Sequence, residues 1–383
     1  MRLFVVVLYS LFLTGNAYSQ GLPRDVATAY RAYEAAVDAE DWTEAALQAE
    51  LAWRGAESGD VDDATVTTLA ANFGEVALIV GDNTGAAEAY ERAVDIMGRR
   101  HEDVETRANY LRLAAQAQYL VEDYRAARNL SADAADAFEN LPESEAIWVG
   151  IYQSQMIRAF AYMRGGNAIR GGRFARQALE ALSHIGPVNN DETASLAFLA
   201  GLNSALSRQA TEAAYYFTLT SYINDEIEAG EDASNIALAW ARYMRGTMSA
   251  DERAELLNRL QNSGYRPAEC SIGDSGCYDS PEWVDSFGSD AAVVDAEPER
   301  RIPPQYPAEA AGAGLEGMAL MRYTITAEGR ATDIEAVYSV PHSVFADASE
   351  DVLRRWRFRP ATVDGIPVER TDRYTQFEFA LAN

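Results

Sequence analysis

Cysteine and histidine are the residue types with the most versatile chemistry, and both are scarce in this chain. Cys270 and Cys277 have six residues between them, in a stretch rich in glycine and acidic residues. A pair this close in a loop-like segment predicts one local disulfide in an oxidising compartment, with free thiols as the alternative. The three histidines, His101, His184 and His342, are far apart in sequence, so we expect no metal site.

Other arrangements that support catalysis are missing from the sequence. There is no His-Glu-x-x-His metal motif, no Gly-x-Ser-x-Gly nucleophile turn and no glycine-rich phosphate loop. The acidic pair Asp62-Asp63 lies in a loop-like stretch, where solvated side chains are the ordinary interpretation. We therefore predict no catalytic residues and no cofactor, and we do not expect an enzyme.

Charge and composition narrow the class of partner. The 383 residues carry a formal charge of -27, and 48% of them are hydrophobic, which is enough for a substantial core. So acidic a surface repels nucleic acid and anionic membrane surfaces. We expect proteins as partners and no nucleic acid.

The N-terminus has the pattern of an export signal. Arg2 precedes the apolar run Leu3 to Leu13, and Ala17-Tyr18-Ser19 then offers small residues for cleavage before Gln20. This predicts a signal peptide over residues 1–19 and a periplasmic protein. The alternative is a retained inner-membrane anchor, although the run is shorter than the roughly 20 residues that span a bilayer.

Residues 22–262 have helical composition and a weak internal repeat. Five short segments each place a small residue about one turn into a predicted helix, at steps of 41, 41, 44 and 42 residues: Ala45, Ala86, Ala127, Gly171 and Ala213. Each is preceded by a further helical pattern, over residues 28–39, 66–80, 106–121, 147–163 and 193–206. Such helix pairs predict a solenoid that resembles tetratricopeptide-like repeats, with an irregular helical bundle as the alternative.

A last helix and a linker follow the repeat. Ser249 and Glu252 form the pattern of a capping box at the start of a helix over residues 249–261. Residues 263–298 are rich in glycine, proline and acidic residues and contain both cysteines. We interpret them as a linker held in part by the predicted disulfide.

Residues 299–383 predict a small α+β domain. Ala319, Met321, Tyr323 and Ile325 alternate with Leu320, Arg322 and Thr324, as in a strand, and a turn at Gly329 leads to a second strand over residues 331–338. A helix is expected over residues 345–356. After a turn at residues 363–367, a third strand is expected over residues 374–381, with Phe377 and Phe379 toward the core. The predicted fold is multidomain: an all-α helical-repeat solenoid followed by a small α+β domain.

A series of motifs in this last domain is similar to the TonB C-terminal domain family. They are Pro304-Gln305-Tyr306-Pro307, Gly314-Leu315-Glu316-Gly317, Gly329, Trp356-Arg357-Phe358-Arg359-Pro360-Ala361 and Gly365-Ile366-Pro367-Val368. The resemblance covers about residues 300–383. It implies a periplasmic domain that captures extended segments of outer-membrane transporters by adding a strand to its sheet.

The resemblance also implies which residues contact a partner. They lie before the first helix and on the last strand: Pro304, Gln305, Tyr306, Tyr374, Gln376 and Glu378. For Tyr306 the simpler interpretation is a packing corner, and for the strand residues it is a solvated face. The four arginines between Arg354 and Arg359 are expected to pair with the chain's own carboxylates rather than with a partner.

Departures from the family shape the functional prediction. A cleavable signal stands where energy-transducing members have a membrane anchor, and a helical repeat stands where they have a proline-rich spacer. We therefore predict a periplasmic protein-binding adapter whose partners are TonB-dependent outer-membrane receptors or other envelope proteins. A homodimer through the C-terminal sheet edge is a further expectation. The alternative function is a TonB-like energy transducer that retains residues 3–14 as its anchor.

Overall fold

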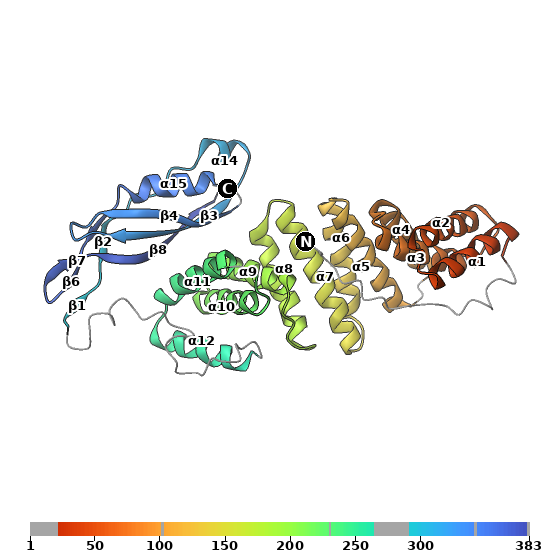
Figure 1. Ribbon diagram of the computed structural model, residues 1–383, viewed down its shortest axis with the longest axis horizontal. Coiled ribbons are helices and arrows are strands. Elements are labelled where there is room, and N and C mark those ends of the chain that lie inside the picture. Colours follow the sequence, from red (N-terminus) through yellow and green to blue (C-terminus); the bar gives the residue numbers. More distant parts are fainter. Residues whose placement is uncertain (1–21, 101–102, 230, 264–290, 341–342, 381–383) are drawn as a thin grey trace. The chain divides into compact units, whose positions relative to one another are not determined.

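The computed structural model describes residues 22–100, 103–229, 231–263, 291–340 and 343–380 (Figure 1). Both cysteines, and the predicted disulfide with them, lie outside these residues, as does the predicted signal peptide. The chain divides into two compact units, with the boundary between Val188 and Asn189. Each unit is described by itself.

The first unit consists of consecutive antiparallel helix pairs (Figure 1). Its elements are α1 (Arg24–Asp38), α2 (Trp42–Ser58), α3 (Asp63–Val80), α4 (Asn83–Arg100), α5 (Val104–Leu120), α6 (Tyr124–Glu139), α7 (Glu145–Arg164) and α8 (Ala168–Ser183). These bounds confirm the predicted helix pairs in this part of the chain.

Polar caps determine where many of these helices begin. The carboxylate of Asp41 accepts a hydrogen bond from the Glu44 amide at 3.1 Å, and Asp123 accepts one from the Ala126 amide at 2.9 Å. Asn167 caps α8 in the same way, through the Arg170 amide. Each cap satisfies one of the amides that a helix leaves unpaired in its first turn.

The small residues that marked the repeat lie at helix–helix contacts. Ala45, Ala86 and Ala127 are fully buried. A Cβ on Gly171 of α8 would lie 2.7 Å from the Ala159 carbonyl oxygen of α7. Because a larger side chain would push the two helices of a pair apart, the alanine and glycine spacing is a requirement of the packing.

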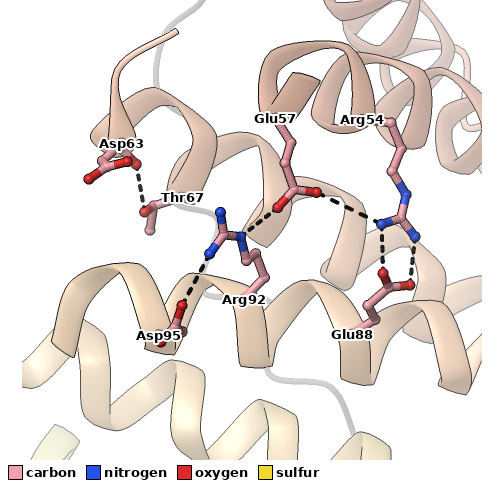
Figure 2. A network of polar contacts seen from close by, with 7 residues as sticks. All are labelled: Arg54, Glu57, Asp63, Thr67, Glu88, Arg92 and Asp95. Atoms are coloured by element: carbon pink, nitrogen blue, oxygen red, sulfur yellow. Dashed lines mark hydrogen bonds and ion pairs between the residues drawn. The ribbon is translucent and has the colours of Figure 1, made fainter. Parts of the chain in front are cut away.

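Ion pairs join successive helix pairs on the outside of this unit. Arg54 of α2 donates two hydrogen bonds to the Glu88 carboxylate of α4, at 2.7 and 2.6 Å, and Arg92 bridges Glu57 and Asp95 (Figure 2). All of these side chains are partly or well exposed, so each pair contributes about 1 kcal/mol or less. The buried apolar residues between the helices therefore contribute most of the stability.

Helix α3 is the most apolar long helix among the described residues. By length and composition it alone of them is compatible with a membrane span, but half of it is buried within the fold. Its residues Leu69, Phe73 and Val76 belong to the core of the first unit. We interpret α3 as a core helix.

The second unit begins with four helices: α9 (Asp191–Leu206), α10 (Ala210–Glu226), α11 (Glu231–Gly246) and α12 (Ala250–Asn262). Ser249 and Glu252 form the predicted capping box of α12. The sequence did not single out α11 as an element. It packs on α10, where the Trp240 ring stacks on Phe217 with ring centres 5.1 Å apart.

A small α+β domain completes the second unit. Its main sheet has the order β4–β3–β8, all antiparallel. The elements of that sheet and its helices are α14 (Ala308–Gly312), β3 (Gly317–Ile325), β4 (Ala331–Val340), α15 (Val344–Leu353) and β8 (Arg370–Phe379). Helix α15 lies on one face of the sheet (Figure 1), and Phe345 and Val352 pack there with Met321 and Phe377.

Short strands extend the domain beyond what the sequence predicted. They are β1 (Val293–Val294), β2 (Glu297–Arg300), β5 (Arg357–Arg359), β6 (Ala361–Val363) and β7 (Ile366–Val368). Strand β2 pairs with β5, and β1 pairs with the β6–β7 hairpin. The residues from Val293 on, which the sequence analysis assigned to the linker, thus pair with this domain.

Candidate functional site: an open sheet edge and the segment beside it

Strand β8 forms one border of the three-stranded sheet, with no further strand beside it among the described residues. From Arg373 to Phe379 it pairs with β3 without a break in register, and the irregular stretch near Asp372, whose φ is +51°, comes before it. A straight strand with one unpaired side presents a row of amide donors and carbonyl acceptors. This border is the one suited to strand addition.

The opposite border is much less regular. The pairing of β4 with β3 shifts register twice, and Asp333 has a φ of +47° within the strand. Charged Asp333 and Glu335 are exposed there, and Glu335 forms an ion pair with Arg322. Bulges and charges of this kind protect an edge against pairing.

The backbone direction of β8 follows from a contact at its centre. The Gln376 amide donates a hydrogen bond to the Tyr243 phenol of α11, so this amide points away from β3. By the two-residue period of a strand, the main-chain groups of Tyr374 and Glu378 point the same way. Tyr374, Gln376 and Glu378, the strand residues predicted to contact a partner, therefore have main-chain amide and carbonyl groups that point away from β3.

The side chains of these three residues lie in different surroundings. Tyr374 is half-buried and packs against the helices of this unit rather than lying in solvent. Gln376 is half-buried and donates to the exposed Glu378 carboxylate at 3.0 Å. Only the Glu378 side chain is exposed, as the simpler interpretation predicted for all three.

The segment before α14 is held on the domain at two points. The Trp356 indole donates to the Ile302 carbonyl at 2.9 Å, and the Tyr306 hydroxyl donates to the Leu315 carbonyl. The Tyr306 ring meets Phe345 and Phe379 edge-on, with ring centres 6.1 and 5.9 Å apart. Burial raises the pKa of Tyr306, and nearby Glu316 adds to the effect.

These contacts place Tyr306 on the face of the sheet that α15 covers, whereas Tyr374 packs on the opposite face. Tyr306 packs against the end of β8 through Phe379, as a packing corner would, while Gln305 beside it is exposed and Pro304 is half-buried. The tyrosine acts as the anchor of this segment, and the glutamine is the side chain left free to make contacts.

Charges around the site are mostly neutralised within the chain. Asp295 pairs with Arg370 at 2.8 Å and with Arg373 at 2.9 Å, at the start of the regular part of β8. Arg354 pairs with Glu350, and Arg359 lies 3.4 Å from Glu297, which confirms for these two arginines the predicted pairing with the chain's own carboxylates. A partner at this edge would therefore meet main-chain hydrogen-bonding groups rather than a strong net charge.

Two residues that contact β8 were missed by the sequence analysis, Tyr243 and Asp295. The i, i+3 pair of Trp240 and Tyr243 on a helical pattern was the available signal for the first, and nothing local marked the second. Among the described residues, no group of three or more His, Cys, Asp or Glu side chains could hold a metal ion.

Comparison with known proteins finds relatives of the C-terminal region. Residues 302–381 match the family model described as Gram-negative bacterial TonB protein C-terminal. Protein TonB of Pseudomonas aeruginosa is 38% identical over 76 residues, which are 20% of this chain and 22% of that protein. Protein TonB of Escherichia coli K12 is 32% identical over 60 residues, 16% of this chain and 25% of that protein. The chain thus spans about a quarter or less of the length of these two relatives.

Two solved structures are similar to separate parts of the chain. The solution structure of the Pseudomonas aeruginosa TonB CTD is 34% identical, covers 23% of this chain and 89% of its own, and has a TM-score of 0.20. A Podosopora anserina putative kinesin light chain with TPR-like repeats is 14% identical, covers 53% of this chain and 96% of its own, and has a TM-score of 0.40. By the family match and the observed helix pairs, residues 302–381 form a TonB C-terminal-type domain that follows a tetratricopeptide-like helical repeat.

Proposed function

We propose that this chain is a periplasmic protein-binding adapter whose C-terminal domain captures an extended segment of another protein along β8. The regular border from Arg373 to Phe379, with no further strand beside it in the part of the chain that the structure describes, is the observation that carries the proposal. Strand addition needs such a border because the main-chain hydrogen bonds provide most of the affinity and need no particular partner sequence. The match to TonB C-terminal domains supports outer-membrane transporters as the class of partner.

The helical repeat gives the adapter a second surface. Stacked helix pairs offer extended surfaces that suit peptides and helices of other proteins. The chain would then connect a protein held by the repeat to one held by β8, without any catalysis. Export through residues 1–19 would place both partners in the cell envelope.

Force transmission is the second candidate function. It is favoured by the similarity to proteins named TonB, over 76 residues in Pseudomonas aeruginosa and 60 residues in Escherichia coli K12. It requires the N-terminal apolar run to be retained as an anchor. N-terminal sequencing of the exported protein separates the two functions, because a mature chain that starts at Gln20 rules out the anchored form.

The binding test uses the full mature chain, immobilised and exposed to a detergent extract of outer membranes. The edge variant is Gln376→Pro, which removes one outward-facing amide while the pairing of β8 with β3 is kept, because proline is tolerated on an edge. Ile366→Ala, on the exposed hairpin of the same domain, is the matched control. We expect the wild type and the control to capture similar amounts of transporter. The proline variant should capture about tenfold less, or lower still.

A second measurement uses the wild-type chain, so it does not depend on whether the proline variant folds. In the wild type, the amides of Tyr374 and Glu378 should become protected from hydrogen exchange when a captured chain is present. Capture of soluble envelope proteins alone would contradict the link to transport. Equal capture by the wild type and the proline variant, with no new protection on β8, would contradict strand addition itself.

A second copy of the chain is the alternative occupant of the same border. Two β8 strands can pair edge to edge, as expected for the homodimer. The molar mass of the isolated chain by light scattering distinguishes the two occupants. If the wild type is a dimer and Gln376→Pro is a monomer, the edge is already filled by self-association.

A further inference from the structure

The second face of the sheet is buried, although it carries no helix of the C-terminal domain. Met318 and Leu320 of β3 are 0% exposed, and they point away from the face that α15 covers. Both belong to a second apolar cluster together with Leu202, Trp240 and Met244. Helices α9 to α11 of the same unit therefore cover this face of the sheet.

Aromatic side chains form the centre of this contact. Tyr338 of β4 meets Phe198 of α9 edge-on, with ring centres 5.0 Å apart, and Trp240 of α11 at 6.5 Å. Trp240 in turn stacks on Phe217 of α10. Tyr338 does not contribute to the core beneath α15, so it serves the contact with the helices.

Helix α11 also reaches the border of the sheet. It contacts both β4 and β8, the two outer strands, and so crosses the whole covered face. At β8 the Tyr243 phenol accepts the hydrogen bond of the Gln376 amide. This is one of the outward-facing amides that an added strand would need.

We infer that α11 is a latch that keeps the binding border of β8 closed, and that a captured strand must displace Tyr243 from the Gln376 amide. The latch consists of Trp240 and Tyr243 of α11 against Tyr338 and Gln376 of the sheet. The inference rests on the proposed strand addition at β8. If the closed state dominates, the apparent affinity for a partner falls by the fraction of molecules that are open.

Two variants open the latch by different routes. Tyr338→Ala removes the aromatic contact from the sheet side without touching the core beneath α15. Tyr243→Phe removes one hydrogen bond at the border and keeps the ring. Tyr338→Phe is the matched control, because it preserves the ring contacts with Phe198 and Trp240.

The experiment measures the full chain in two ways. Without any partner, hydrogen exchange at the Gln376 amide should rise about tenfold or more in both opening variants and stay at the wild-type rate in Tyr338→Phe. With a limiting amount of protein and an outer-membrane extract, the opening variants should capture more transporter than the wild type. Together these results would support a latch that gates the border.

The possible failures are distinguishable. Unchanged exchange at Gln376 in both opening variants would overturn the latch. Faster exchange with no gain in capture, while the wild type does capture transporters, would show that the contact does not gate binding and would also overturn it. If exchange rises as expected but no variant and no wild-type chain captures any protein, the proposed function fails instead.

Discussion

The Phe358 amide donates a hydrogen bond to the Gly329 carbonyl at 3.0 Å, and a Cβ on Gly329 would lie 2.0 Å from the Phe358 carbonyl oxygen. Gly329 also has a φ of +75°. The turn between β3 and β4 therefore tolerates no side chain, for a steric and a conformational reason at once. This contact joins the turn to β5, the strand that follows α15.

Substitution at this turn should be costly. We expect Gly329→Ala to lower the free energy of unfolding by more than about 2 kcal/mol, because the backbone must move to relieve the overlap. Gly365→Ala is the control, since Gly365 has a φ of +78° with open space around it and should lose only about 1 kcal/mol. Urea denaturation measures both, and similar losses would contradict the steric argument.

In the segment before α14, Tyr306 should affect the stability of the domain and Gln305 should affect partner binding. Tyr306→Phe removes the hydrogen bond to Leu315 and keeps the ring contacts, so we expect about 1 kcal/mol less stability with partner binding unchanged. Gln305→Ala should leave stability unchanged and weaken binding, because that side chain is exposed. Thermal unfolding and the outer-membrane capture assay measure the two effects. If Tyr306→Phe weakened partner binding and Gln305→Ala did not, the assignment of anchoring to Tyr306 and of partner contact to Gln305 would be wrong.

Acid should weaken the helical repeat through its caps. The Thr65 hydroxyl, with the Thr65 amide, lowers the pKa of Asp62 below 3.8, and Thr106 lowers that of Asp103 in the same way. Because the folded pKa is lower, the stabilisation is complete above about pH 4 and is lost as the pH falls through the folded pKa.

The contribution of these caps is tested by two substitutions that keep a side-chain oxygen to accept the capping hydrogen bond. Asp62→Asn and Asp103→Asn together should flatten the fall in stability below about pH 4, because asparagine still caps but does not titrate. Thermal unfolding across acid pH, followed by circular dichroism, measures this. An acid profile identical to that of the wild type would show that other carboxylates dominate.

Alkaline conditions should loosen the contact between α11 and the sheet. Burial raises the pKa of Tyr338 from 10.0 to about 12, so the docked state holds the phenolic proton more tightly than a solvated tyrosine does. The contact keeps its full strength below pH 10.0 and weakens as the pH rises to about 12. Limited proteolysis of the chain across this range should show increasing cleavage in the wild type and a smaller increase in Tyr338→Phe.

Local patterns were enough to predict most elements. The recurring small residues marked the second helix of each pair, and the alternation from Ala319 to Ile325 marked a strand, because these periods follow from backbone geometry alone. The sixth helix pair consists of α11 and α12, and only α12 was predicted, from the capping box of Ser249 and Glu252. No comparable local signal marked the start of α11.

The covered face of the sheet could not be predicted from local patterns. Leu320 alternates with Arg322 and Thr324 on that face, a mixture typical of a solvated surface. The apolar residues that meet the helices are spread over three strands, with Met318 on β3, Tyr338 on β4 and Tyr374 on β8. Only the folded sheet gathers them, and the contact between Trp240 of α11 and Tyr338 joins positions 98 residues apart in the chain.

The two borders of the sheet differ in regularity, and this difference determines how many chains can join it. Because the pairing of β4 shifts register twice and that of β8 is regular from Arg373 to Phe379, the sheet is suited to extension on one side only. On the proposed strand addition, each copy of this sheet would therefore accept one further strand.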